Sequence, residues 1–323
     1  MSMNRIRTLT AAALLAYAVP ASAVTLFADY SQLSASGSVY QSAGGQLSET
    51  AAPGFVDVTG LFKTDVSAAF AYLDNAILVP FNHTVTFKLF DLQSTGADGD
   101  SLVTGEDANG RPISSTIRID TSAASHFFLD PTPLDNSEYA MTFSNATLGG
   151  GSVNVERFGT AVTGGPADGR TDLLTLALHE TIQSIGITDN IQRFVDAVGA
   201  GAAPGSPDRL MTIPTSLTGL PTDFTIPFLG ASAHIDTFAD GGTFRHAVVS
   251  EPGFGEGDRA LITGAEVYAL CVVEGCSANQ FNTDPNPNAA IPEPGTLLLL
   301  SSVGLALIGT RRRAGRWVPV ASS

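Results

Sequence analysis

The residues best suited to chemistry lie in one stretch, residues 173–190, which reads LLTLALHETIQSIGITDN. His179 and Glu180 are adjacent, and Gln183 follows the histidine by four residues. Residues four apart on a helix lie one turn apart on the same face, so we expect His179 and Gln183 to point the same way. An imidazole followed by a carboxylate on one helix can supply a metal ligand and a general base. The stretch therefore indicates a metal site in which Gln183 stands at a ligand position.

Residues 179–189 follow the pattern His-Glu-x-x-Gln-x-x-Gly-x-x-Asp. This pattern resembles the extended motif of the metzincin metalloproteases, in the variant that has aspartate as its third ligand. The resemblance implies that His179 is the first zinc ligand and that Glu180 is the general base. It also implies that Gly186 allows the turn and that Asp189 is the third ligand. Gln183 departs from the motif, because a neutral amide binds zinc more weakly than an imidazole does.

Two downstream histidines are candidates for the missing nitrogen ligand. His234 in SAHIDTF and His246 in FRHAVVS lie where a metzincin chain returns beneath its metal. The family places a methionine turn there, but this chain has valines in HAVVSEP, and Met211 comes too early. We therefore expect zinc as the cofactor, bound weakly or not at all.

The surrounding segments extend the resemblance over residues 110–275. PLDNSEYAMTFSNA, GRTDLLTLALHE and GDRALITGAEVYAL are similar to segments of secreted PEP-CTERM metalloproteases. This similarity implies a zincin-like α+β fold, in which a mixed sheet is crossed by the metal-site helix and the C-terminal half is rich in loops. Three interpretations stay open: an exported protein whose metal centre is inactive, an active zinc metalloendopeptidase with a substitute ligand, and a structural domain associated with exopolysaccharide.

The elements that must position these residues follow from hydrophobic periodicity. Residues 65–77 have apolar side chains at helical spacing, and residues 173–185 form a helix capped by Asp172 or Thr171 and ended by Gly186. Thr263 and Glu266 make a capping box for a late helix. Strands are predicted at residues 83–92, 115–121, 139–145 and 152–158.

Two further segments are predicted to be irregular. Residues 94–112 are polar and rich in glycine, and we interpret them as a solvated hairpin loop. Their carboxylates lack the spacing of a calcium loop: Asp98, Asp100, Glu106 and Asp107. The chain after Gly199 is rich in proline and glycine and shows little periodicity.

Both ends of the chain carry targeting features. Residues 1–23 have two arginines, a short apolar core and the small residues ASA, which predict a signal peptide removed by signal peptidase. At the other end, the apolar run 297–309 lies between two clusters, Pro292, Glu293 and Pro294 and then Arg311, Arg312 and Arg313. This order resembles the PEP-CTERM sorting signal of Gram-negative bacteria, which implies cleavage by an exosortase-type enzyme after transient membrane insertion.

These features predict four parts: the signal peptide at 1–23, a zincin-like domain at 24–280, a polar linker at 281–291 and the sorting signal at 292–323. Without the two signals, the chain has 10 basic and 30 acidic residues and a net charge of −20. Such a charge repels nucleic acid, so we exclude nucleic acid as a partner. The destination is the cell surface or the extracellular space, where Cys271 and Cys276 are predicted to form a disulfide.

Overall fold

The computed structural model describes residues 24–201, 203, 206–230, 232–236, 242–251 and 254–287. The chain divides into two units, Met1–Pro285 and Asn286–Ser323, and the described helices and strands belong to the first. The predicted signal peptide and sorting signal lie outside the described residues. Among the described helices, none is long and apolar enough to cross a membrane.

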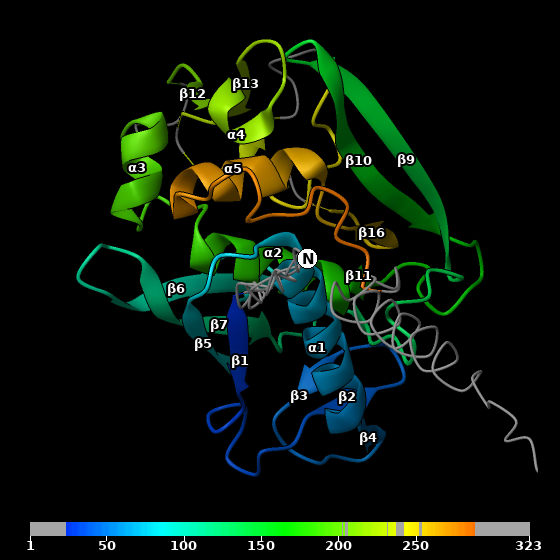
Figure 1. Cartoon of the computed structure of the whole chain (residues 1–323). Helices are drawn as coiled ribbons and strands as arrows, with labels where there is room; N and C mark the ends of the chain where they lie inside the picture. The colour runs from blue at the N-terminus through cyan, green and yellow to red at the C-terminus, as the bar shows by residue number, and fades with distance from the viewer. Residues whose placement is uncertain are drawn as a thin grey trace, which may run out of the picture. The chain divides into compact units, whose positions relative to one another are not determined.

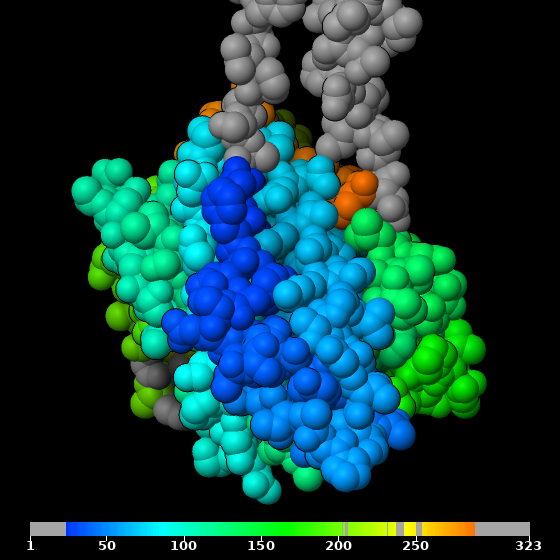
Figure 2. Space-filling model, turned by 90° about the horizontal axis from the view of Figure 1, so that it is seen from below, coloured from blue at the N-terminus to red at the C-terminus, as the bar shows by residue number. Residues whose placement is uncertain are grey.

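The fold is α+β, as predicted, and its largest described sheets have four strands each. The sheet below the site has the order β1–β5–β7–β6, in which β1, β5 and β7 run parallel and β6 runs antiparallel at the edge. Its strands are β1 (Thr25–Asp29), β5 (Asn82–Phe90), β7 (Pro112–Asp120) and β6 (Gly99–Glu106). Helices α1 (Thr59–Ala76) and α2 (Leu173–Ile185) pack on this sheet and on each other, and Figure 2 shows β1 in dark blue beside α1 in light blue.

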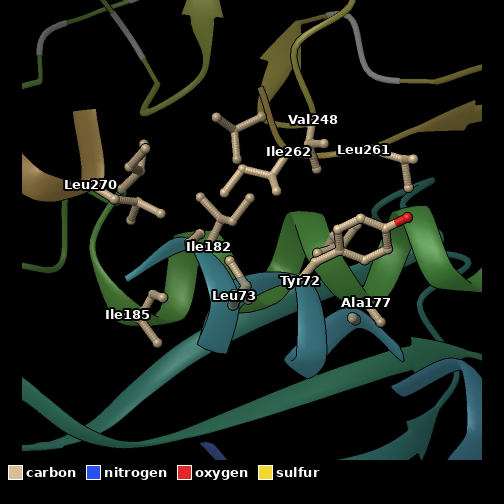
Figure 3. Packing of buried hydrophobic residues seen from close by; sticks show 14 of the residues in the cluster. Tyr72, Leu73, Ala177, Ile182, Ile185, Val248, Leu261, Ile262 and Leu270 are labelled. Carbon is tan, nitrogen blue, oxygen red and sulfur yellow. The ribbon is translucent and has the colours of Figure 1, made fainter. Parts of the chain in front are cut away.

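Helix α2 begins and ends where the sequence predicts. The side chain of Asp172 caps it by accepting a hydrogen bond from the Thr175 amide at 3.0 Å, and Gly186 ends it. A Cβ atom on Gly186 would lie 2.8 Å from Leu270 Cδ2, so a larger residue here would have to displace this side chain of helix α5 (Gly264–Glu274). Figure 3 shows Ile182 and Leu270 meeting in one apolar cluster together with Leu73 of α1. Helix α2 is therefore held between the sheet, α1 and α5.

The prediction for residues 94–112 was wrong. Strand β6 runs through residues 99–106 of this segment and pairs with β7, whereas the start of the segment, at Thr95 and Gly96, and the tip at Asp107–Gly110 are turns. The error has a physical cause. An edge strand with one exposed face needs few apolar residues. Of the two adjacent apolar residues in β6, Leu102 is 56% exposed and Val103 packs against the core. Strand β6 matters because it forms one wall of the site described below.

The second half of the chain contains more regular structure than its sequence indicates. Figure 1 shows the hairpin of β9 and β10 on one side of α5 and α3 on the other, with β12 and β13 above α5 in this view. The bounds of the remaining elements are β9 (Tyr139–Leu148), β10 (Gly151–Ala161), β16 (Asp258–Ala260), α3 (Gln192–Val198), β12 (Arg209–Ile213), α4 (Thr215–Thr218), β13 (Phe224–Phe228), β14 (Ile235–Asp236) and β15 (Ser250–Glu251). Small elements complete the described part: β2 (Tyr40–Ser42), β3 (Leu47–Ser48), β4 (Phe55–Asp57), β8 (Phe127–Phe128) and β11 (Thr171–Asp172).

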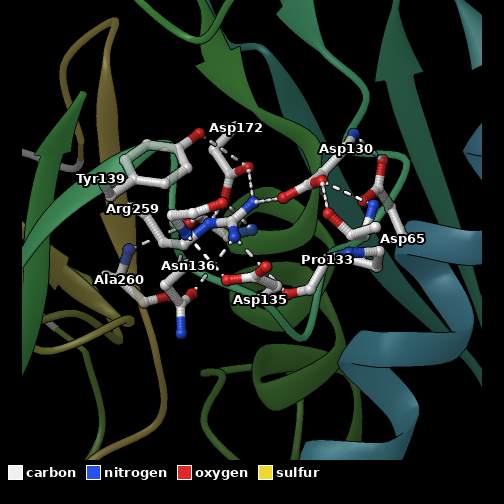
Figure 4. A network of polar contacts seen from close by, with 12 residues as sticks. Asp65, Asp130, Pro133, Asp135, Asn136, Tyr139, Asp172, Arg259 and Ala260 are labelled. Carbon is white, nitrogen blue, oxygen red and sulfur yellow. Dashed lines mark hydrogen bonds and ion pairs between the residues drawn. The ribbon is translucent and has the colours of Figure 1, made fainter. Parts of the chain in front are cut away.

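A buried ionic network fixes the start of α2 (Figure 4). Arg259 of β16 is fully buried and contacts Asp172 at 2.7 Å and Asp130 at 2.8 Å. The Tyr139 hydroxyl donates a further hydrogen bond to Asp172 at 3.1 Å. A buried guanidinium is tolerated only when carboxylates neutralise it, so this arrangement ties the capping residue of α2 to β16.

The two cysteines are joined. Cys271, in the last turn of α5, and Cys276 form a disulfide across five positions of the sequence. Gly275 between them ends α5 in the left-handed conformation, with a φ of 70°. A cysteine within a helix can be held away from a second cysteine that follows the helix. Here the turn at Gly275 reverses the chain and brings the second thiol back to the helix.

Candidate functional site

Three side chains from distant parts of the sequence meet above α2. His179 and Gln183 lie one turn apart on α2, and His234 comes from the loop that precedes β14. Gln183 Nε2 lies 3.1 Å from His179 Nε2 and 3.0 Å from His234 Nε2. The two imidazole nitrogens are 3.4 Å apart. Of the two histidines that the sequence offered as substitute ligands, the structure brings His234 to the motif helix.

In a neutral imidazole ring, the hydrogen bond made by Nδ1 determines whether the proton lies on Nδ1 and leaves the lone pair on Nε2. His179 Nδ1 lies 2.7 Å from the carbonyl oxygen of Val248, which can only accept, so Nδ1 carries the proton. Nε2 of His179 then has a free lone pair directed at Gln183. His234 Nδ1 contacts the Ser232 hydroxyl at 3.1 Å, and because a hydroxyl can accept as well as donate, this contact is compatible with a proton on Nδ1 of His234 too. This is the tautomer that a histidine adopts when Nε2 binds a metal.

The donor set fits a zinc ion. In a tetrahedral site with Zn–N distances of about 2.0–2.1 Å, ligand nitrogens lie about 3.3–3.4 Å apart. The Nε2 atoms of His179 and His234 have this separation, 3.4 Å. The Gln183 amide can turn its oxygen inward, because the Ser101 hydroxyl that contacts its Oε1 at 3.3 Å can accept as well as donate. Among the described residues, no group of three or more His, Cys, Asp or Glu side chains is placed to hold a metal ion, and Gln183 is the side chain that both imidazole nitrogens contact.

Asp189, the expected third ligand, is engaged elsewhere. Its Oδ1 lies 2.5 Å from Arg209 Nη1, and Arg209 also donates to the carbonyl oxygens of Leu229 and Ser232. Arg209 is only 8% exposed, so it needs a carboxylate nearby. Asp189 does not line the pocket that contains His179. The spacing of the motif therefore places an aspartate after the turn, but its charge neutralises an arginine.

His246 also lies apart from the pocket. Its ring stacks on Phe158 with centroids 4.0 Å apart, and Nδ1 contacts the Glu156 carboxylate. Two other histidines occupy the positions expected of packed or surface residues: His83 is buried against Ser115 Oγ at 2.9 Å, and His126 lies on the surface 3.6 Å from Glu256.

Glu180 is a buried carboxylate beside the two histidines. It is 3% exposed, and its Oε2 has no hydrogen-bond partner. Burial raises the pKa of Glu180 to about 8, and a hydrogen bond from Ser101 offsets only part of this effect. Burial also lowers the pKa of His234 to about 3, with a further contribution from neighbouring His179. Both histidines are therefore neutral at pH 7, as a metal ligand must be.

These side chains line an open pocket of ≈ 420 Å³. The beginning of the edge strand β6 lines it at Gly99, Asp100 and Ser101, and Phe254 and Asp258 line it as well. The floor is α2, with His179, Glu180 and Gln183. Five carboxylates and no lysine or arginine are among the described residues that line it, so the pocket attracts cations.

The sequence predicted the residues of α2 in this pocket but not the residues that contact them. Ser101 and Val248 both contact the motif residues, and neither belongs to a recognisable local motif. Ser101 and Val103 lie on one face of β6, and the exposed residues alternate with them. This alternation could have predicted a strand, but the surrounding acidic residues favoured the prediction of a loop.

Comparison with known proteins identifies one segment. No curated protein and no solved structure matches the chain. A family description, the PEP-CTERM protein-sorting motif, matches residues 290–313. This segment contains the Pro-Glu-Pro motif, the apolar run and the arginine cluster that the sequence analysis singled out. The chain thus carries a PEP-CTERM motif and is an exported protein targeted for sorting by an exosortase.

Proposed function

We propose that the pocket is a zinc-dependent hydrolytic site of an exported protein, with His179, His234 and Gln183 as ligands and peptides as substrate. The observation that supports it is the convergence of two imidazole nitrogens, 3.4 Å apart, on one amide in an open pocket. A zinc ion bound there supplies Lewis-acid polarisation of a carbonyl group. Because one ligand is a neutral amide, we expect binding weaker than that of a site with three imidazoles.

Glu180 and β6 would carry the remaining roles. Glu180 is adjacent to His179, lines the same pocket and has an unpartnered oxygen, so in its ionised form, which predominates above a pH of about 8, it would accept the proton of an attacking water. The strand β6 is the edge of its sheet and borders the pocket at Gly99–Ser101. An edge strand offers unpaired backbone groups to an extended chain, and this supports a peptide as the substrate class.

A second candidate function is supported by the orientation of Gln183. Its amide nitrogen has two hydrogens, and the two histidine lone pairs accept both, at 3.1 and 3.0 Å. This hydrogen-bonded triad satisfies all three side chains without a metal. On this interpretation the centre is catalytically inactive, and the exported domain acts as a binding protein.

Zinc content and peptidase activity of the full chain test the proposal. We expect wild type to bind one zinc with a measurable affinity, and Gln183→His to bind it at least about tenfold more tightly. Gln192→His, on the exposed surface of α3, is the matched control and should leave affinity unchanged. Glu180→Gln should retain zinc and lose hydrolysis of an unstructured protein substrate. A wild type without zinc beside a zinc-binding Gln183→His would establish the second candidate instead.

The sorting motif supports two further proposals. The apolar run at residues 297–309 would insert in the membrane before processing, and the mature domain would remain at the cell surface, with exopolysaccharide as one binding partner. Sedimentation of the purified exported protein with the producer's own exopolysaccharide tests the second of these. Absence of co-sedimentation at physiological salt would contradict it.

A further inference from the structure

One short segment, Val248–Val249, contacts both histidines of the site. The carbonyl oxygen of Val248 accepts from His179 Nδ1 at 2.7 Å. The carbonyl oxygen of Val249 accepts from the amide of Ile235 at 2.8 Å, and Ile235 directly follows His234. The position of this segment therefore sets the protonated nitrogen of His179 and the backbone that presents His234.

Regular structure contributes little to holding this segment. It precedes β15, which has two residues and pairs only with the two-residue strand β14. Both valines are fully buried, and Figure 3 shows Val248 packed near Ile262. Apolar packing resists removal of the segment but does not fix the direction of its peptide groups, because it lacks directional bonds.

A buried carboxylate supplies the directional bond. Glu266, on the first turn of α5, is fully buried, and its Oε1 accepts from the Val249 amide at 2.9 Å. Its Oε2 accepts from the amide and the hydroxyl of Thr263, at 2.8 and 2.9 Å. The same carboxylate thus completes the capping box of α5 and anchors the segment that holds the histidines.

We propose that Glu266 is a positioning residue of the site, which keeps His179 in the Nδ1-protonated tautomer and His234 in place through Val248–Val249. This inference rests on the proposed function, because a fixed tautomer matters for binding a metal at Nε2. Without the carboxylate, the Val249 amide lacks an acceptor, the Val248 carbonyl can turn, and His179 can move its proton to Nε2. That tautomer has no lone pair for the metal, so affinity should fall about 10–100-fold, as for other residues that orient ligands.

The test compares variants of α5 in the full chain. Glu266→Met removes both acceptor oxygens and keeps the volume of the side chain, whereas Glu266→Gln keeps one acceptor and should be intermediate. Thr263→Ala removes the cap but leaves the bond to Val249. Glu274→Gln removes another buried carboxylate at the far end of the same helix, where its partners are Arg111 and Arg193. Both controls should lower stability without affecting the histidines.

Two readouts separate positioning from stability. The ¹⁵N chemical shifts of the imidazoles in the metal-free protein report the tautomer, and a chelator competition reports zinc affinity. We expect Glu266→Met to shift the His179 pattern from one tautomer to a mixture and to weaken zinc about 10–100-fold, while Thr263→Ala and Glu274→Gln keep the wild-type pattern. A folded Glu266→Met with wild-type imidazole shifts would overturn the proposal, and so would an equal loss in all four variants.

The test still decides if Glu266→Met does not fold or if wild type binds no zinc. If Glu266→Met does not fold, the same imidazole readout on Glu266→Gln decides: an altered His179 pattern supports the positioning role, and an unchanged one overturns it. If wild type binds no zinc at any concentration, the proposed function fails, but the metal-free tautomer readout still tests Glu266. The two failures are therefore distinguishable.

Discussion

At the scale of single residues, the site depends on a histidine outside the helix motif. His234 lies next to His179 and Gln183, whereas His246 is held by Glu156 and Phe158. The sequence predicted correctly that His179 and Gln183 lie on one face of α2, because a period of 3.6 residues fixes which side chains share a face. It could not choose between the two downstream histidines, since their positions depend on loop contacts such as that of Ser232.

The pair of histidines gives a direct prediction. His234→Ala should weaken zinc binding by at least about tenfold, because it removes one of the two proposed imidazole ligands. His246→Ala is the matched control, and it should leave affinity within about twofold because its ring lies apart from the pocket. Chelator competition measures both. Equal losses in the two variants would show that the site is not the one described.

At the scale of elements, α2 is fixed at its start by a charge network. Asp172 caps the helix and also contacts the buried Arg259. Asp172→Ala should reduce the free energy of unfolding by about 3–5 kcal/mol, because it leaves a buried guanidinium underpaired and removes a cap. Urea denaturation measures this. Asp57→Ala, which removes an exposed carboxylate that contacts the Thr59 amide at the start of α1, should have a much smaller effect; comparable effects would contradict the network's role.

Helix α1 contains a carboxylate that makes stability depend on pH. Burial raises the pKa of Asp74 from 3.8 to about 6, and its Oδ1 has no hydrogen-bond partner. A raised pKa in the folded state contributes stability below pH 4 that is lost as the pH rises through about 6. Asp74→Asn should therefore be more stable than wild type at pH 7 by about 1–2 kcal/mol, a value reduced for partial exposure, and should lose this advantage near pH 3.5.

Unfolding experiments at both pH values check this prediction. Asp29→Asn is the control of opposite sign, because hydrogen bonds from Ser31 hold the pKa of Asp29 below its usual value. This variant should be destabilised at pH 7 relative to pH 3.5. A difference between Asp74→Asn and wild type that does not change with pH would show that Asp74 is ionised normally in the folded protein.

The elements also show where pattern reading succeeds and fails. The caps Asp172 and Thr263 and the terminating Gly186 were predictable, because each satisfies local backbone groups. Strand β6 was not, because an exposed edge strand has no strong alternation and its acidic residues resemble those of a loop. The carboxylate of Asp189 was assigned to a metal because the motif resembles that of the metzincins, and its pairing with Arg209 is a long-range contact that no local pattern encodes.

At the scale of the whole molecule, charge and sorting act together. Residues 24–291 carry a net charge of −20, and this charge attracts cations toward the acid-lined pocket. The PEP-CTERM motif at residues 290–313 directs the chain to an exosortase. Replacing Pro292, Glu293 and Pro294 with alanine should therefore leave the chain uncleaved and bound to the membrane in the producing cell.

Cell fractionation and the mass of the recovered chain measure this outcome. The matched control replaces Asn286, Pro287 and Asn288, which lie in the polar linker before the matched segment. That variant should be processed as wild type. Normal processing of the triple-alanine variant would show that the motif is not the recognition element.

The central claim is a zinc site built from two histidines and an amide. Zinc K-edge X-ray absorption on the full chain, loaded with one equivalent of zinc, tests it most directly. The account predicts two imidazole nitrogens and two oxygens at about 2.0–2.2 Å, with one imidazole lost in His234→Ala and both kept in His246→Ala. Zinc held with no imidazole ligand, or with the same ligands in wild type and His234→Ala, would contradict the account.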